Sequence, residues 1–219
     1  MLFNSYEFIF AFLPITFFIY FYLNHKRLTI AAKGFLVFSS LFFYSWWDIA
    51  YLPLILSSIL FNYLIGTTLS KSNENNKIGL NKTFSKKSIL IFGIACNVAL
   101  LGYFKYTNFF LENFNGIFES NIPFQHIILP LGISFFTFTQ IAFLVDAYRN
   151  EVKEYDLVRY MLFVTYFPHL LAGPILHHKE MMPQFANLKN SVVNYRNIAL
   201  GLFIFSIGLF KKVVIADTF

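Results

Sequence analysis

Long apolar segments alternate with short polar or charged ones along most of this chain. Seven of the apolar segments approach the roughly 20 residues that a helix needs to cross the hydrocarbon core of a bilayer, about 30 Å thick. In chain order they are 8–23, 34–47, 49–69, 88–103, 127–145, 157–176 and 198–210. The pattern predicts an all-α fold, a polytopic transmembrane helical bundle that occupies residues 1–219 as a single membrane domain.

The sixth segment differs from the others because Pro168, Gly173 and Pro174 interrupt it and His169 lies inside the interruption. Broken backbone at membrane depth leaves amides without partners, so it is tolerated only when it is buried in protein or lines a water-filled cavity. We therefore expect a broken or re-entrant segment beside a cavity. If this segment spans the bilayer, residues 177–184 lie outside; if it re-enters, they lie inside.

Lysine and arginine are concentrated in some of the short connections. The first apolar segment is followed at once by Lys26 and Arg27, and residues 70–88 contain five lysines against one glutamate. Short cytoplasmic loops carry an excess of such residues, so both connections are predicted to be cytoplasmic, and 70–88 is predicted to be a basic cytoplasmic loop. The amino terminus is then outside the cytoplasmic membrane. Seven crossings would place the carboxyl end, with Lys211 and Lys212, inside.

Composition excludes a soluble domain. Hydrophobic residues make up 57% of the chain and charged residues 13%, against about 25% charged residues in typical soluble domains. The net charge of +6 is spread over connections between apolar segments, which argues against nucleic acid as a partner and favours the lipid bilayer.

The sequence predicts neither a disulfide nor a metal site. Cys96 is the single cysteine, so no intrachain disulfide can form. His177, His178 and Glu180 superficially resemble a metal-binding cluster, but adjacent histidines do not share a helix face.

Three polar residues in the fifth segment have helical spacing. Ser134, Thr137 and Gln140 are three residues apart, which at 100° per residue confines them to about 120° of one helix face. Such a stripe can line a channel. Equally, hydroxyls and amides commonly hold neighbouring membrane helices together by hydrogen bonds.

His169 is the ionisable candidate for proton transfer. Histidine titrates near neutral pH and can take a proton from a hydroxyl, so it can act as a general base or form a polar wall of a channel together with Pro168, Gly173 and Pro174. The alternative is a structural histidine whose nitrogens satisfy backbone groups freed by the two prolines.

Four phrases of the sequence, in chain order, are MLFNSYEFIFAFLPITFFIYF, FYSWWDIAYLPLILSSILFNYLIG, LPLGISFFTFTQIAFLVDAYRN and YFPHLLAGPILHHKEMMPQF. Together they resemble the membrane-bound O-acyltransferase family, and within it the alginate O-acetyltransferase-like branch. They cover most of the chain, and four phrases in the same order are specific to the family, though not to the polysaccharide.

This resemblance implies an enzyme that transfers an acetyl group. The donor would be acetyl-CoA or another cytoplasmic acyl thioester, with no bound cofactor. The acceptor would be an extracytoplasmic polysaccharide or a periplasmic or extracellular acetyltransferase partner. The family's key catalytic histidine lies in a later membrane segment, and no counterpart precedes Phe219. The resemblance therefore implies an amino-terminal fragment that is inactive alone, with His169 as its candidate catalytic residue.

Two other functions are compatible with the same pattern. A transporter or flippase for a lipid-linked saccharide also uses broken helices, and would move its substrate without an acyl donor. A non-catalytic membrane subunit would recruit a partner through the lysines of residues 70–88.

Overall fold

The computed structural model describes residues 2–78, 85–120, 122–125, 127–152, 156–170, 173 and 178–218, with backbone alone for 71–78 and 188. Every regular element in these residues is helical, which confirms the predicted all-α membrane fold. In order, the elements are η1 (Glu7–Phe12), α1 (Leu13–His25), α2 (Thr29–Ser45), η2 (Ile49–Tyr51), α3 (Leu52–Ile78), α4 (Lys86–Leu101), η3 (Gly102–Tyr106), α5 (Thr107–Phe118), α6 (Ile133–Tyr148), α7 (Leu157–Thr165), α8 (Phe167–Leu170), α9 (His178–Ala186), η4 (Leu188–Ser191), α10 (Tyr195–Phe210) and η5 (Lys211–Ala216).

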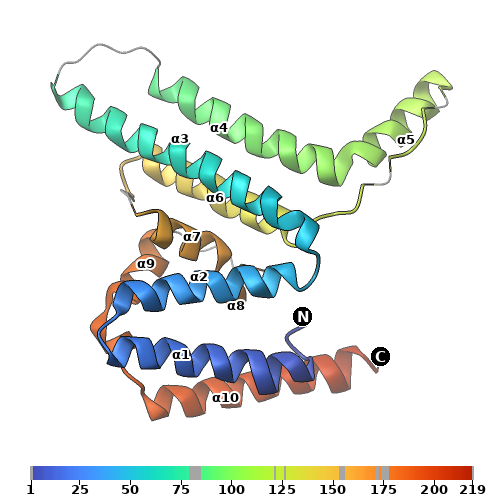
Figure 1. Ribbon diagram of the computed structural model, residues 1–219. Helices are drawn as coiled ribbons and strands as arrows, with labels where there is room; N and C mark the ends of the chain where they lie inside the picture. The colour runs from blue at the N-terminus through green and yellow to red at the C-terminus, as the bar shows by residue number, and fades with distance from the viewer. Residues whose placement is uncertain are drawn as a thin grey trace.

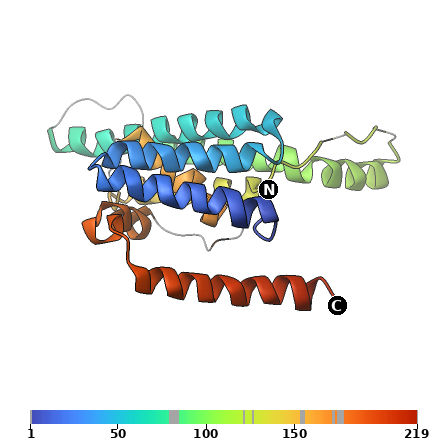
Figure 2. The same ribbon diagram turned by 60° about the horizontal axis from the view of Figure 1, so that its bottom comes forward.

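The longer helices run back and forth along one common direction (Figure 1). On one side α6 packs against both α3 and α4; on the other, α2 packs against α1 and α7. Contacts of α7 with α3 and α6 join the two groups. Helix α10 stands to one side of the bundle (Figure 2), and Phe205 links it to the core by packing against the cluster of Phe8, Phe12, Phe43 and Phe167.

Four helical segments are long and apolar enough to cross a membrane: Glu7–His25, Ile49–Ser70, Lys86–Phe118 and Tyr195–Ala216. Two shorter apolar helices, Thr29–Ser45 and Ile133–Tyr148, accompany them. The chain is therefore a multi-pass membrane protein, and six of the seven predicted segments contain an apolar helix of this kind.

Two predicted boundaries are wrong. The fifth segment was expected to be helical from residue 127, but α6 starts at Ile133 after an extended stretch, and Gly132 with φ 67° precedes it. Only glycine readily adopts that left-handed conformation, so Gly132 fixes the start of the helix. In the predicted basic loop 70–88, α3 continues to Ile78 and α4 begins at Lys86. Residues 79–84 lie outside the described residues, and the membrane side of this loop stays a prediction.

The sixth segment re-enters. Helix α7 starts at the end of the bundle where α6 finishes, α8 follows after a break, and α9 packs back against α7. Lys179 of α9 forms an ion pair with Glu151, which directly follows α6. The chain thus enters and returns at the same end of the bundle, and the prediction of seven full crossings is wrong.

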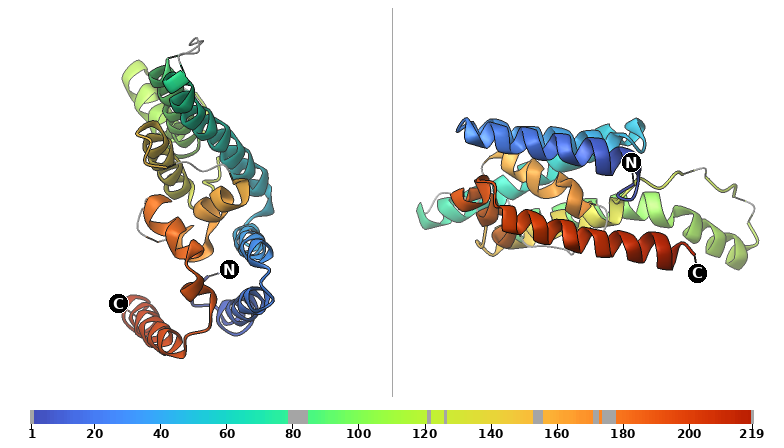
Figure 3. Two further views of the ribbon diagram at one scale, coloured as in Figure 1. Left: turned by 90° about the vertical axis from the view of Figure 1, so that its left-hand side faces the viewer. Right: turned by 90° about the horizontal axis from the view of Figure 1, so that it is seen from below.

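Re-entry changes the position of the carboxyl end. The two chain ends lie at the same end of the bundle (Figure 3). An outside amino terminus and an inside carboxyl end, both predicted from charge, are therefore incompatible. With one crossing fewer than predicted, every later helix runs in the opposite direction, so the carboxyl end lies on the opposite side of the bundle from the side predicted.

Candidate functional site

The broken segment is interrupted at Tyr166. Helix α7 ends at Thr165, Tyr166 has ψ 109°, and α8 resumes at Phe167. Pro168 occupies the second position of α8, where its missing N–H would have had no partner inside the helix. The break therefore lies two residues before the proline, at Tyr166.

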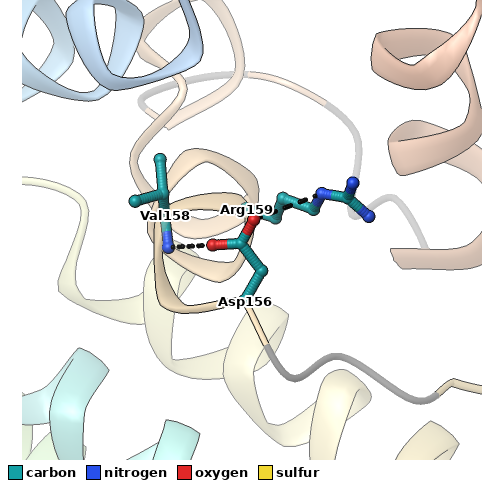
Figure 4. A network of polar contacts seen from close by, with 3 residues as sticks. All are labelled: Asp156, Val158 and Arg159. Carbon is teal, nitrogen blue, oxygen red and sulfur yellow. Dashed lines mark hydrogen bonds and ion pairs between the residues drawn. The ribbon is translucent and has the colours of Figure 1, made fainter. Parts of the chain in front are cut away.

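Asp156 fixes the beginning of α7 (Figure 4). Its carboxylate accepts a hydrogen bond of 2.9 Å from the backbone N–H of Val158 and lies 3.4 Å from Nε of Arg159. An acidic N-cap satisfies a free amide and complements the positive end of the helix dipole. This capped start directs α7 into the bundle.

Ser40 of α2 satisfies the backbone at the break. Its hydroxyl donates to the Leu36 carbonyl at 2.7 Å and accepts from the Phe167 amide at 3.2 Å. Ser40 is completely buried. A serine on a neighbouring helix thus provides the acceptor that the interrupted helix lacks.

Aromatic packing holds α8 in position. The ring of Phe167 lies 5.1 Å from Phe12, 5.7 Å from Phe43 and 6.1 Å from Phe8, between ring centroids. These distances are in the range of favourable edge and offset ring contacts. The cluster joins η1, α2 and α8.

His169 is buried in the short helix that follows the break. Only 5% of its surface is exposed, and its ring meets the edge of Phe135 at 4.8 Å between centroids. Gly173 donates its backbone N–H to the His169 carbonyl at 3.1 Å. A Cβ atom on Gly173 would lie 2.8 Å from His169 Cα and 2.9 Å from Cδ2, so this close approach requires glycine.

A cavity of about 440 Å³ adjoins the break. Its walls come from α1, α2, residues 166–169, α9 and η4. Most of the lining is aromatic or aliphatic, and its polar members are Thr16, Tyr20, Tyr166, His169, Gln184 and Asn190. A few polar groups in a largely apolar hollow of this size are typical of a small-molecule site. Among the described lining residues, His169 supplies the imidazole, a group that can accept and donate protons.

The three polar residues with helical spacing on α6 do not line this cavity. Thr137 and Gln140 are completely buried, and Ser58 of α3 lies 3.4 Å from the Gln140 amide oxygen. Ser134 is half-buried, with Nζ of Lys105 3.5 Å from its hydroxyl. None of the three stripe residues is among the described residues that line the 440 Å³ cavity.

Next to Gln140 is a pair of asparagines that the sequence did not single out. Asn62 Nδ2 donates to Asn97 Oδ1 at 3.1 Å, and Asn97 Nδ2 donates to Asn62 Oδ1 at 2.6 Å. Both side chains are buried. We call Ser58, Asn62, Asn97 and Gln140 the polar seam, because these residues hydrogen-bond α3 to α4 and α6 in the interior.

The structure therefore separates the candidate residues into two places. Pro168, His169 and Gly173 are together at the break, while Ser134, Thr137 and Gln140 follow α6; Pro174 lies outside the described residues. Sequence reasoning missed Ser40, Gln184 and Asn190. No local signal marks them, because the fold alone brings α2, α9 and η4 to the break.

The histidines do not form a metal cluster in the described part of the chain. No group of three His, Cys, Asp or Glu side chains there has suitable geometry. His178 is buried with its ring 5.0 Å from Phe163 and 5.6 Å from Phe143. His177 lies outside the described residues.

Comparison with known proteins gives consistent relatives. The model of the membrane-bound O-acyltransferase family, MBOAT, matches residues 89–219. A peptidoglycan O-acetyltransferase from Helicobacter pylori is 47% identical, over 99% of this chain and 45% of that protein. The probable alginate O-acetylase AlgI of Pseudomonas aeruginosa is 37% identical, over 100% of this chain and 40% of that protein. The chain thus spans less than half the length of these relatives and matches their amino-terminal part. No solved structure gives a significant match.

Proposed function

This chain belongs to the membrane-bound O-acyltransferase family, and from that premise we propose that it contributes to O-acetylation of an extracytoplasmic polysaccharide. The observation that carries the proposal is the family match over residues 89–219, together with relatives named for O-acetyl transfer. The donor is acetyl-CoA or another cytoplasmic acyl thioester. The acceptor is a hydroxyl of the polysaccharide or of a relay acetyltransferase.

The reaction needs a base and a place for the acyl group. The acceptor hydroxyl gives its proton to a base and attacks the thioester carbonyl; the C–S bond then breaks, and the leaving thiolate takes up a proton. The apolar cavity beside His169 supports a role of this region in forming the acyl path. A dry wall strengthens the electrostatic interactions that stabilise the oxyanion.

Within that path His169 is our candidate for proton transfer, since its buried imidazole lines the cavity. From the resemblance to the family we expect the principal catalytic histidine in a later segment than those present here. We therefore propose that residues 1–219 alone do not transfer acetyl groups. Release of free CoA by the purified chain with acetyl-CoA and glycan, abolished by His169→Ala, would overturn this.

The relatives support a more specific proposal for the acceptor. Identity is higher to the peptidoglycan O-acetyltransferase than to the alginate O-acetylase, 47% against 37%. We propose a cell-wall glycan as the acceptor. Isolated peptidoglycan and secreted polysaccharide from the same cells, treated separately with mild base, would show which of them releases acetate.

Deletion of the gene tests acyl transfer itself. Cells without it should lose ester-bound acetate from the acceptor glycan and should consume less thioester donor. If ester acetate is unchanged and movement of a lipid-linked saccharide is lost instead, the protein is a transporter. If removing the lysines of residues 70–88 abolishes capture of a partner while acetylation stays normal, a recruiting subunit is the better description.

We also propose that the amino terminus lies outside the cytoplasmic membrane. The connection between α1 and α2 contains Lys26 and Arg27, and it lies at the same end of the bundle as the start of α4 with Lys86 and Lys87. This end is the more basic, which supports a cytoplasmic position for it. Alkaline phosphatase fused to either chain end should be active, because both ends lie at the opposite face.

A further inference from the structure

A helical arm projects from the bundle at the end that holds the chain termini (Figure 1). It consists of α5 and the chain that returns along it, and we call the described residues 107–120, 122–125, 127 and 128 the 107–128 arm. Glu119, at φ 51° in the left-handed region, ends α5. Neither the acyltransferase proposal nor the cavity uses this arm.

Two asparagines attach the returning chain to the helix. The side chain of Asn108 donates to the backbone carbonyl of Gln125 at 2.8 Å and accepts from the backbone N–H of Gln125 at 3.0 Å. Asn115 makes the same pair of bonds with Ile122, at 2.9 and 3.2 Å. Each asparagine side chain thus pairs with both the backbone N–H and the backbone C=O of one residue, as a neighbouring β-strand would.

The spacing of these two clamps is matched. Asn108 and Asn115 are seven residues apart, which places them on the same side of the helix and about 10 Å apart along its axis. From Ile122 to Gln125 an extended chain also advances about 10 Å. The arm is therefore a built hairpin of helix and extended chain, and the Tyr51 hydroxyl holds its base by donating to the Ile128 carbonyl at 2.7 Å.

Most of the remaining helix surface is apolar and open; Asn113, also exposed on that side, donates its side-chain N–H to the Phe109 carbonyl at 2.7 Å. The exposed fractions run from 45% to 74% for Phe109, Phe110, Phe114, Ile117 and Phe118. At 100° per residue these side chains cover about half of the helix, whereas Asn108, Glu112, Asn115 and Glu119 fall within about 60° of the opposite side. The arm has a phenylalanine-rich face and a narrow polar face.

The length of the helix indicates what covers the apolar face. Lys86–Phe118 is continuous for 33 residues, about 50 Å at 1.5 Å per residue, but the bilayer core takes up about 30 Å. The excess, about 20 Å, is close to the length of α5. The π-helical stretch Gly102–Tyr106 separates α5 from α4, and Figure 1 shows the helix bending there.

The apolar face of α5 also continues the exposed apolar surface of α4 and η3, where Ile91, Phe92 and Val98 of α4 and Tyr103 of η3 are each more than half exposed. We propose that the 107–128 arm lies in the membrane–water interface, with its phenylalanine face in the lipid and its asparagine-clamped face toward water. The occupant is the lipid surface rather than a protein. The face lacks the Trp and Arg side chains that dominate protein interfaces, and it is continuous with a surface that lipid already covers.

Nitroxide labels on the two faces test this in the full chain. The protein with Cys96→Ala is reconstituted in phosphatidylcholine nanodiscs, with a label at Phe114→Cys or, as the matched control, at Glu112→Cys. We expect the label at 114 to collide with oxygen several-fold more than with a water-soluble nickel chelate, and the label at 112 to show the reverse. The difference should be insensitive to salt, since α5 contains no lysine or arginine.

Two outcomes would overturn the proposal. If the nickel chelate reaches both labels equally, the arm stands free in water and its apolar face awaits a protein partner. If the chelate reaches neither, α5 is embedded as part of a span. Ile117→Cys, on the apolar face, repeats the measurement if a label at 114 disturbs folding.

Discussion

The polar seam and the break at Tyr166 contain the same kinds of residue but use them differently. At the seam, Asn62 and Asn97 satisfy each other and hold helices in direct contact. At the break, Ser40 satisfies the backbone amide of Phe167, and a cavity remains beside it. The seam residues Ser58, Asn62 and Asn97 line a hollow of about 260 Å³, smaller than the one of about 440 Å³ that His169 lines. The two regions therefore differ in the size of the hollow and in whether side chains or backbone provide the partners across the helices.

Glycine shows the same contrast. A Cβ on Gly66 would lie 2.3 Å from Phe143 Cε1, because α3 and α6 are in close contact there. A Cβ on Gly173 would meet His169, next to the cavity. Close packing at Gly66 therefore holds α3 against α6, whereas close packing at Gly173 fixes the position of the His169 imidazole.

The largest effect is expected from overpacking the contact between α3 and α6 at Gly66. Gly66→Ala should destabilise the protein by about 2–3 kcal/mol, because the Phe143 ring must move. Unfolding in detergent measures the change. Gly34→Ala is the control, since nothing lies within 4 Å of its Cβ position, and it should be neutral or stabilising. Equal behaviour of the two variants would show that α3 and α6 do not pack this closely.

Breaking the asparagine pair should have the next largest effect. Asn62→Leu leaves Asn97 without its reciprocal partner and should cost about 1–2 kcal/mol. The double variant Asn62→Leu/Asn97→Leu should recover part of this loss, because no polar group of the pair stays buried alone. Additive losses in the unfolding free energy would instead mean that the two amides act independently.

A smaller effect is expected at the break. Ser40→Ala removes the acceptor of the Phe167 amide and should cost about 1 kcal/mol. It should also increase modification of His169 by diethyl pyrocarbonate, measured by mass spectrometry, because α8 is less firmly held. Ser39→Ala, at the neighbouring buried position, should leave that modification unchanged. The same reactivity in both variants would remove Ser40 from the support of His169.

The smallest effect is expected at the re-entry ion pair. Its hydrogen bond and attraction to Glu151 raise the pKa of Lys179. A raised lysine pKa means that the stabilisation is complete below the usual value and is lost only as pH rises through the raised one. The contribution of this ion pair to the free energy of unfolding should therefore stay constant from about pH 6 to about pH 9. Glu151→Gln should leave the unfolding midpoint nearly unchanged, since both partners are solvent-exposed.

Much of the fold was predictable because membrane helices are long apolar segments. The hydrophobic pattern located the helices of Glu7–His25, Ile49–Ser70 and Tyr195–Ala216 within a few residues. The prolines and glycine around His169 correctly indicated a broken segment, because these residues interrupt backbone hydrogen bonding. The four phrases correctly indicated the family.

Other features depended on contacts that no local pattern encodes. Equal spacing of Ser134, Thr137 and Gln140 did not reveal that α3 covers Gln140. The charge of Lys211 and Lys212 favoured a cytoplasmic end, but the re-entry of α7 and α8 placed them with the amino terminus. Charge bias acts on each connection separately, whereas the side of a helix depends on every crossing before it.

The sequence by itself determined that this chain is an all-helical membrane protein, because bilayer thickness sets helix length and the apolar pattern records it directly. The O-acyltransferase family followed from the resemblance of four phrases, and not from that pattern. Only the tertiary structure decided which segment re-enters, which helix supplies Ser40 to the break, and that His169 borders a cavity while Gln140 belongs to a seam. These properties arise from contacts between residues far apart in the chain, and such contacts exist only once the helices have packed.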